Sequence, residues 1–158
     1  MIKMDKQGKV QITKEGFDSL TEELGRLVNE KRPGYVERLS SAREEGDLSE
    51  NSDYTNAKDE LEFLDGKIVE LKQVLKNAQI VNHEGKRSDV VIGAKVTLRV
   101  NSSQQIYHIV GQWEADPVKR KISYQSPLGK ALVGKKKGDC VEIEAPAGKV
   151  IYEILAIE

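Results

Sequence analysis

Cysteine, histidine and aromatic residues are scarce in this chain of 158 residues, and each scarcity excludes a class of protein. The single cysteine, Cys140, excludes an internal disulfide framework and is typical of a reducing compartment. His83 and His108 are too isolated for a metal site, and with one cysteine they cannot supply a nucleophile, a base and an acid. Aromatic residues make up only 5%, too few for one thick core. The alternating pattern around Cys140 predicts a buried, inert thiol.

Long apolar runs are also missing. No stretch approaches a membrane span, and the N-terminus has no apolar region of the kind found in export signals. We therefore expect a soluble, cytoplasmic protein without a membrane partner. The net charge of −1 argues neither for nor against nucleic acid. Residues 1–80 nevertheless carry net charge −4 and residues 81–158 carry +3, an asymmetry that indicates two modules.

The first half has the apolar spacing of two long helices. Thr13 can cap a helix that starts at Lys14. Its apolar residues recur at Phe17, Leu20, Leu24, Leu27 or Val28, and then at Tyr35, Leu39 and Ala42. Pro33-Gly34 interrupts this pattern, so we expect a kink or short break there, and the pattern ends at Gly46.

A heptad pattern runs through the second helix, with Asn51 or Ser52 as its cap and Asn77 near its end. The apolar positions are Tyr54, Ala57, Leu61, Leu64, Ile68, Leu71, Leu75 and Ala78. About 25 residues at ~1.5 Å each make an arm of roughly 37 Å. One narrow apolar seam on each helix predicts an antiparallel two-helix coiled coil, and we assign residues 1–82 to this domain.

The second half, residues 83–158, has the period of two that is typical of strands. The predicted strands are 96–100, 106–110, 141–144 and 150–155, with turns at 101–103 and 146–148. A short helix is predicted from Pro127 to Val133, with Ser126 as its cap and Pro127 at its first position. The chain is therefore predicted to be α+β, a coiled coil followed by an antiparallel sheet domain with one short helix.

An acidic turn joins the two predicted helices. Five acids fall within ten residues around Gly46: Glu44, Glu45, Asp47, Glu50 and Asp53. Favourable charge near a helix N-terminus explains one or two of them, and the spacing does not match an EF-hand loop. Asp47 and Glu50 could hold Mg²⁺ only weakly, because this ion keeps most of its waters. The turn therefore has the donors of half a metal site, to be completed by another molecule.

Many short motifs, in order along nearly the whole chain, resemble the bacterial Gre family of transcript cleavage and elongation factors, the GreA type in particular. The matching residues are Ile12-Thr13 with Gly16 and Leu20, Arg32-Pro33, Ala42-Arg43-Glu44, 46–54, 78–80, 93–96, 107–111, Glu114-Ala115-Asp116, 123–129, Gly134, Gly138-Asp139 and 145–148.

This resemblance implies a C-terminal domain of FKBP-like fold and a coiled coil that enters the secondary channel of backtracked bacterial RNA polymerase. It implies that Asp47 and Glu50 help the polymerase hold its second catalytic Mg²⁺ and position water, so that the polymerase cleaves the RNA 3′ end. The factor would then have no nuclease activity and no cofactor of its own. We expect it to act as a monomer.

The resemblance also implies roles for residues around the tip and on the second domain. Arg43 and Lys58 match basic positions that contact the RNA 3′ segment, although Lys58 can equally pair with Glu62 four residues on. Asn51 and Tyr54 would support the tip, and Tyr54 can simply pack in the seam. Ser126 and Pro127 match a loop that docks on the polymerase rim, although Pro127 is equally explained as a helix start.

Three other functions compete with transcript cleavage. The same fold can occupy the polymerase channel as an inhibitor, but inhibitory paralogues are expected to carry a different, more acidic tip. The second domain can act as a prolyl isomerase or chaperone, but it has few aromatic residues to line a proline pocket. A generic coiled-coil adaptor would leave the acidic turn unexplained.

Overall fold

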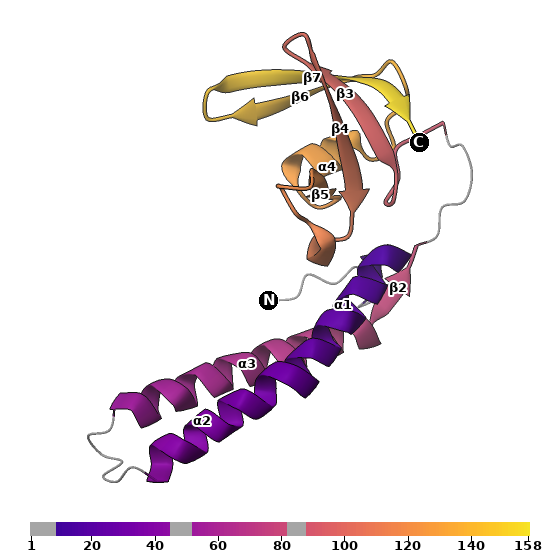
Figure 1. Ribbon diagram of the computed structural model, residues 1–158. Coiled ribbons are helices and arrows are strands. Elements are labelled where there is room, and N and C mark those ends of the chain that lie inside the picture. Colours follow the sequence, from indigo (N-terminus) through magenta and orange to yellow (C-terminus); the bar gives the residue numbers. More distant parts are fainter. Residues whose placement is uncertain (1–8, 45–51, 82–87) are drawn as a thin grey trace. The chain divides into compact units, whose positions relative to one another are not determined.

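The computed structural model describes residues 9–44, 52–81 and 88–158, which form two compact units (Figure 1). The first unit, from Asp18 to Asn77, is helical. The second runs from Ala78 to Glu158 and also includes the chain up to Phe17. The strands β1 (Val10–Ile12) and β2 (Ala78–Ile80), which flank the helices in sequence, are thus grouped with the sheet. The expected α+β organisation, helical hairpin first and sheet second, is confirmed.

A helical hairpin forms the first unit, as the two apolar stripes predict. Helices α1 (Lys14–Arg26) and α2 (Arg32–Glu44) follow one another, and α3 (Ser52–Lys76) runs back beside α2 in the antiparallel sense (Figure 1). The seam of α3 is buried at Ala57, Leu64, Ile68, Leu71 and Val74. Val74 lies outside the predicted heptad, so near its C-terminal end the buried face of α3 includes one position beyond the predicted seam.

The helix continues through Pro33-Gly34, so the expected short break is absent, while the alternative of a kink stays a prediction. Instead a π-helical segment, η1 (Leu27–Lys31), connects α1 to α2 directly before the proline. Its wider turn is marked by the N–H of Arg32, which donates to the carbonyl of Leu27 five residues earlier. Proline lacks an N–H, and its ring clashes with the carbonyl four residues back. The wider turn therefore accommodates Pro33 without ending the helix.

A curled five-stranded sheet forms most of the second unit, in the order β5-β4-β3-β7-β6 (Figure 1). Its strands are β3 (Lys95–Val100), β4 (Ser103–Val110), β5 (Lys121–Ser123), β6 (Cys140–Ala145) and β7 (Gly148–Ile157). Every pair is antiparallel except β4 with β5, which is parallel, so the sheet is mixed rather than purely antiparallel. A separate parallel pair, β1 with β2, was not predicted.

The core of this unit lies between the sheet and α4 (Pro127–Leu132). Side chains that are at most 6% exposed fill it: Val90, Ala94, Val96, Leu98, Ile109, Leu132, Val141 and Ile154. The turn from β3 to β4 has positive φ at Asn101 and Ser102, the conformation of a tight two-residue hairpin. Both the predicted turns and the predicted short helix are therefore present.

The thiol of Cys140 is exposed, and the prediction of a buried thiol was wrong. The alternation itself was read correctly, because Val141 is 5% exposed while Glu142 is exposed. Cys140 lies one residue before Val141, so its side chain projects to the same face as that of Glu142. The error was to assign the cysteine to the apolar face of a strand whose period places it on the other face.

Glu114, at the end of a short 3₁₀ turn, η2 (Gln112–Glu114), caps the start of α1 from a distance of 101 residues in sequence. Its carboxylate accepts hydrogen bonds from the N–H of Thr13 at 2.9 Å, from the N–H of Gly111 at 2.9 Å, and from the Thr13 hydroxyl. The Thr13 oxygen in turn accepts from the N–H of Gly16 at 3.1 Å, which confirms Thr13 as the helix cap.

This arrangement is a capping box in which the acid comes from elsewhere in the chain. In the usual box the acidic side chain is three residues after the cap. Here that position is Gly16, and a methyl group on it would overlap the carboxyl group of Glu114. The glycine therefore makes room for the remote carboxylate, which fixes the first turn of α1 to η2.

Candidate functional site

The end of the hairpin is the candidate site, and the structure describes the two helix ends that border it. Helix α2 is described to Glu44 and α3 from Ser52. The predicted metal-holding residues Asp47 and Glu50, and the predicted support residue Asn51, fall between these ends and lie outside the described residues. The structure therefore describes the frame of the site, which we define as the ends of α2 and α3 on either side of these positions.

The two helices are closely packed near this end. Ala42 on α2 is 2% exposed and Ala57 on α3 is 1% exposed, so small side chains are fully enclosed close to the helix ends. Tyr54, one turn before Ala57, is half-buried. This burial agrees with the packing role in the seam. The frame that flanks positions 45–51 is thus a paired helix on each side rather than two fraying ends.

Ion pairs between the helices reinforce the frame. Arg38 on α2 contacts Glu60 and, at 3.3 Å, Asp53 on α3. Farther from the tip, Arg32 forms a two-bonded pair with Asp65, with Nε to Oδ1 at 2.7 Å and Nη2 to Oδ2 at 3.1 Å. These hydrogen bonds lower the pKa of Asp65 and raise that of Arg32. Because all five charged groups are exposed, each pair adds little stability alone but specifies how the helices align.

Asp53 is one of the five clustered acids, and its contact with Arg38 explains it structurally. A carboxylate in the first turn of α3 is also favourable beside the positive end of the helix dipole. Asp53 therefore belongs to the frame of the hairpin.

The two basic residues predicted to contact RNA border the tip on opposite helices. Arg43 lies in the last turn of α2 and is exposed, and no ion pair joins it to another described residue. Lys58 lies on α3, and its ammonium is 3.9 Å from the carboxylate of Glu62. That distance, between side chains that are both more than half exposed, is a weak pairing, so it leaves Lys58 available to a phosphate.

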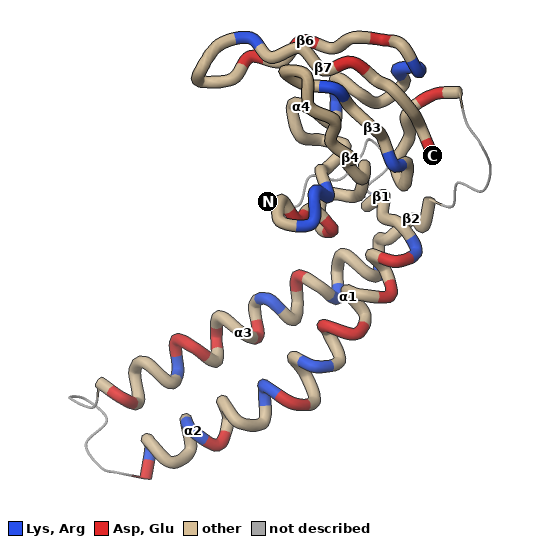
Figure 2. The backbone as a smooth tube through the Cα atoms, turned by 45° about the horizontal axis from the view of Figure 1, so that its top comes forward, with Lys and Arg blue, Asp and Glu red and all other residues tan. Residues whose placement is uncertain are grey.

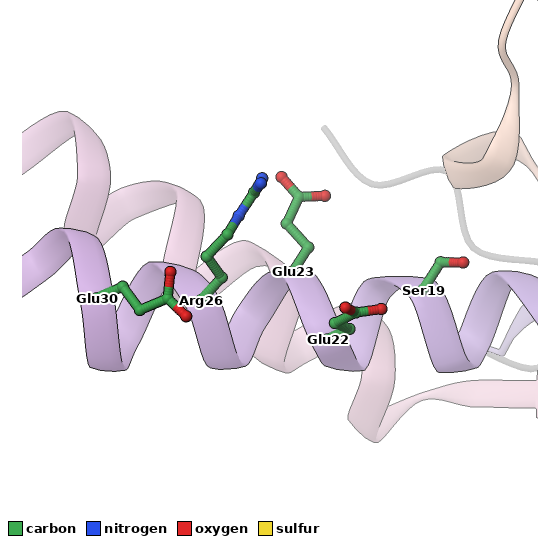
Figure 3. Close-up of a pocket in the computed structure, with 5 residues that line it drawn as sticks. All are labelled: Ser19, Glu22, Glu23, Arg26 and Glu30. Atoms are coloured by element: carbon green, nitrogen blue, oxygen red, sulfur yellow. The ribbon is translucent and has the colours of Figure 1, made fainter.

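Charged residues of both signs follow one another along the described helices of the hairpin, as the coloured tube in Figure 2 shows. One group, on α1 and η1, lines a hollow of about 350 Å³ and consists of Ser19, Glu22, Glu23, Arg26 and Glu30. Glu23 and Arg26 rise on the same side of α1 in Figure 3. Glu23 also binds Lys67 of α3 at 2.6 Å, so part of this group serves to pair the helices.

The sequence analysis missed an apolar hollow on the same hairpin. Phe63 is 79% exposed, because it lies outside the heptad seam of α3. With Leu27, Tyr35, Leu64 and charged neighbours it lines a cavity of about 410 Å³. A large apolar residue at a position where the heptad predicts solvent is the signal that could have found it.

The predicted docking residues begin α4 on the sheet unit. The Ser126 hydroxyl accepts from the N–H of Gly129 at 3.0 Å and donates to the carbonyl of Ser123 at 2.7 Å, so it is confirmed as the cap. Pro127 occupies the first helical position and is exposed. Because the Ser126 hydroxyl is engaged in the fold, Pro127 presents the free surface of this pair.

The described residues contain no group of three or more His, Cys, Asp or Glu side chains that could hold a metal ion. Nor does the described part of the chain include a helix long and apolar enough to cross a membrane.

Comparison with known proteins identifies the family of this chain. Residues 10–80 match the family model described as transcription elongation factor, N-terminal, and residues 85–158 match that described as transcription elongation factor, GreA/GreB, C-term. The chain is 45% identical over 152 residues to transcription elongation factor GreA of Trichlorobacter lovleyi, covering 94% of this chain and 96% of that one. It is 42% identical over 158 residues to transcription elongation factor GreA of Clostridium acetobutylicum, covering 98% and 100%.

Among solved structures, the chain is similar to GreA factor homolog 1 (Gfh1) of Thermus thermophilus, at 29% identity, with 95% of this chain and 99% of that chain covered and a TM-score of 0.45. Both halves of the chain are thus matched by models of one family, at identities above 40% with curated relatives over nearly the full length. The chain therefore belongs to the GreA/GreB family of transcription elongation factors.

Proposed function

We propose that this protein acts on bacterial RNA polymerase during elongation and stimulates cleavage of the RNA 3′ end in backtracked complexes. The observation that carries the proposal is the pair Asp47 and Glu50 between two helices that remain paired up to the described ends of the hairpin. A rigid two-helix arm can carry a short charged segment into a narrow channel, whereas a flexible loop of the same charge would pay a larger ordering entropy.

The donor set suits Mg²⁺. Two carboxylates give hard oxygen ligands but leave most of the octahedral positions to water and to another molecule. In two-metal hydrolysis one ion activates the attacking water and the other stabilises the leaving oxygen. Asp47 and Glu50 would help to hold the more weakly bound ion of the polymerase and orient the water, so that the polymerase carries out the cleavage.

Basic residues next to the tip fit the same role. Arg43 and Lys58 flank the acidic segment from α2 and α3, and both are exposed. Their positive charges would hold the phosphates of the displaced RNA 3′ segment, which carry no sequence information. Ser126 and Pro127 at the start of α4 would dock the second unit on the rim of the channel.

The test is RNA 3′-end cleavage by a backtracked bacterial RNA polymerase at limiting Mg²⁺, with and without the protein. The wild-type chain should speed the release of 3′ fragments. The variant Asp47→Ala/Glu50→Ala should abolish this stimulation and keep nearly the same affinity for polymerase, because the removed groups act on the metal and water rather than on docking.

A matched control removes two acids from the exposed surface of α3, Asp59→Ala/Glu70→Ala, and changes the net charge by the same amount. It should stimulate cleavage as the wild type does. Stimulation that persists in the Asp47/Glu50 variant would refute the role of the tip. Wild-type binding without stimulation would instead favour an inhibitor that occupies the channel.

A further inference from the structure

The apolar hollow on the hairpin combines enclosed side chains with one exposed aromatic ring. Leu27 of η1 and Leu64 of α3 line it and are 2% and 6% exposed, and Tyr35 of α2 is half-buried. Phe63, next to Leu64, is 79% exposed. Burial of apolar area drives most protein association, and aromatic side chains are enriched at the cores of interfaces. Phe63 therefore offers an anchor to a second molecule.

The surface of α3 beside this ring is bare. Gly66 lies one turn after Phe63 and is exposed, and a Cβ added to it would meet nothing within 4 Å. Glycine weakens a helix interior relative to alanine, so α3 by itself gains nothing from it. The missing side chain lets a second helix approach α3 closely beside the ring.

The end of the hollow nearer the tip of the hairpin is acidic. Asp59 and Glu60 line it, close to the start of α3. Glu60 is bound by Arg38 of α2, so its charge is balanced within the hairpin. Asp59 is exposed and forms no ion pair with another described residue. One negative charge is therefore unbalanced at this end.

The opposite end of the hollow is basic. Lys31, the last residue of η1, and Lys67 of α3 line it. Lys67 is bound by Glu23 of α1 at 2.6 Å, whereas Lys31 is exposed and has no ion pair with the rest of the described chain. The hollow thus carries one unbalanced charge of each sign, Asp59 at one end and Lys31 at the other.

We propose that two copies of this chain associate through the hollow, with their hairpins antiparallel and the Phe63 ring of each in the hollow of the other. A two-fold contact uses the same surface on both copies, so that surface must be complementary to itself. The hollow meets this condition, because a two-fold rotation exchanges its ends and brings Asp59 of each copy to Lys31 of the other. An unrelated partner would have to match both ends, whereas a second copy matches them by symmetry.

The other charge on this side of α3 is compatible with the arrangement. Glu70 is exposed and lies seven residues after Phe63, and Asn56 lies seven residues before it. In an antiparallel pair of α3 helices centred on Phe63, Glu70 of one copy is therefore opposite Asn56 of the other. The acid meets an amide rather than a like charge.

The association would store the protein in an inactive form. It covers one side of α2 and α3 and doubles the number of helices in the arm, so the arm no longer fits a narrow channel. This consequence rests on the proposed function, whereas the association itself does not. At the low concentrations of a cleavage assay the protein is monomeric, so a substitution at Asp59 leaves the stimulation of cleavage unchanged.

Sedimentation velocity of the full-length protein, without polymerase, measures the association. One aromatic anchor and two symmetry-related ion pairs make a small interface, so we expect a Kd on the order of 100 μM and use concentrations up to about 1 mM. The average mass should rise from monomer toward dimer over this range. Phe63→Ala should weaken the association about a hundredfold and stay monomeric. The matched control is Val69→Ala, which removes an apolar side chain that is 55% exposed on α3 outside the hollow, and it should associate as the wild type does.

Charge reversal tests the two-fold arrangement. Asp59→Lys or Lys31→Glu alone places like charges together at both symmetry-related contacts, so each should weaken self-association about tenfold. An equal mixture of these two variants restores opposite charges at both contacts and should associate about as tightly as the wild type. The measurement is made at about 150 mM salt, where charges more than about 8 Å apart are largely screened.

All these variants should keep the urea midpoint of the wild type, because the replaced side chains are exposed. A wild type that stays monomeric at about 1 mM, a dimer that persists in Phe63→Ala, or a mixture that associates no better than its components would each overturn the proposal. A monomeric wild type whose affinity for polymerase falls in Phe63→Ala but not in Val69→Ala would assign the hollow to polymerase instead. Because sedimentation is measured without polymerase, its failure leaves the cleavage proposal untouched.

Discussion

Replacing Gly16 with alanine tests whether the remote carboxylate of Glu114 holds the first turn of α1. The new methyl group would occupy the space of the carboxyl group, and the backbone of Gly16 is helical, so alanine is otherwise acceptable there. The steric conflict is with the end of a flexible side chain, which can move away. Moving it, however, breaks the hydrogen bonds to Thr13 and Gly111. The substitution should therefore lower the free energy of unfolding by the amount that those hydrogen bonds contribute.

The expected loss of stability follows from the three hydrogen bonds that the Glu114 carboxylate accepts. Bonds to a charged group contribute about 1.5–3 kcal/mol when isolated, but these share a half-buried acceptor, so we expect Glu114→Ala to destabilise by about 3 kcal/mol in total. Gly16→Ala should cost about 2 kcal/mol, because alanine recovers roughly 0.5–1 kcal/mol of helix preference. In the Glu114→Ala background the same change should instead stabilise by up to about 1 kcal/mol, because the obstacle is gone. The coupling energy is then about 3 kcal/mol.

Urea unfolding followed by tryptophan fluorescence measures all four members of this cycle. Trp113 is the only tryptophan and lies directly before Glu114 in η2, so its emission reports on the unit concerned. Gly25→Ala is the control, since Gly25 is also in α1 and an added methyl group would meet nothing within 4 Å. It should not destabilise either background. If Gly16→Ala costs the same with and without Glu114, the capping role of Glu114 is refuted.

Two further predictions concern the second unit. Because the lowered pKa of His108 lies below its ordinary value of 6.5, the unfolded chain takes up the proton first, so stability should fall as pH drops through 6.5 and level off below the folded-state pKa. His108→Gln should flatten this part of the pH profile, as measured by urea midpoints at about pH 7.5 and about pH 5.5; an unchanged slope would contradict it. Gly129 is buried in α4, and a methyl group there would overlap the carbonyl oxygen of Ser123, which belongs to the backbone and cannot swing aside. Gly129→Ala should therefore lower stability by about 1–3 kcal/mol in the same assay, whereas Gly66→Ala on open α3 surface should not; equal effects would count against it.

The local sequence pattern predicted most of the helices and strands, because their caps and apolar periods depend on residues that are close together in the sequence. Thr13 and Ser126 act as caps through bonds to residues three positions on, and the heptad of α3 needs only a facing helix. The alternation in β6 was equally legible, yet Cys140 was assigned to the wrong face because apolar character was given more weight than the period. Pro33 predicted an irregularity, but whether the helix breaks or widens depends on the packing that holds both sides together, and the hairpin keeps them aligned.

The functional residues can likewise be separated into those that the sequence predicted and those that only the tertiary structure brought together. Asp47 and Glu50 were predicted from the sequence because clustered charge on a helical hairpin is a local feature, whereas Arg43 and Lys58 were predicted from the resemblance to the Gre family. The sequence alone also determined the family, since its motifs follow one another along the chain. Only the tertiary structure placed Glu114 on Thr13 across 101 residues, and only the pairing of the helices placed Leu27 and Tyr35 around one hollow with Phe63. Pairings between distant segments depend on how the whole chain closes on itself, and no local spacing encodes them.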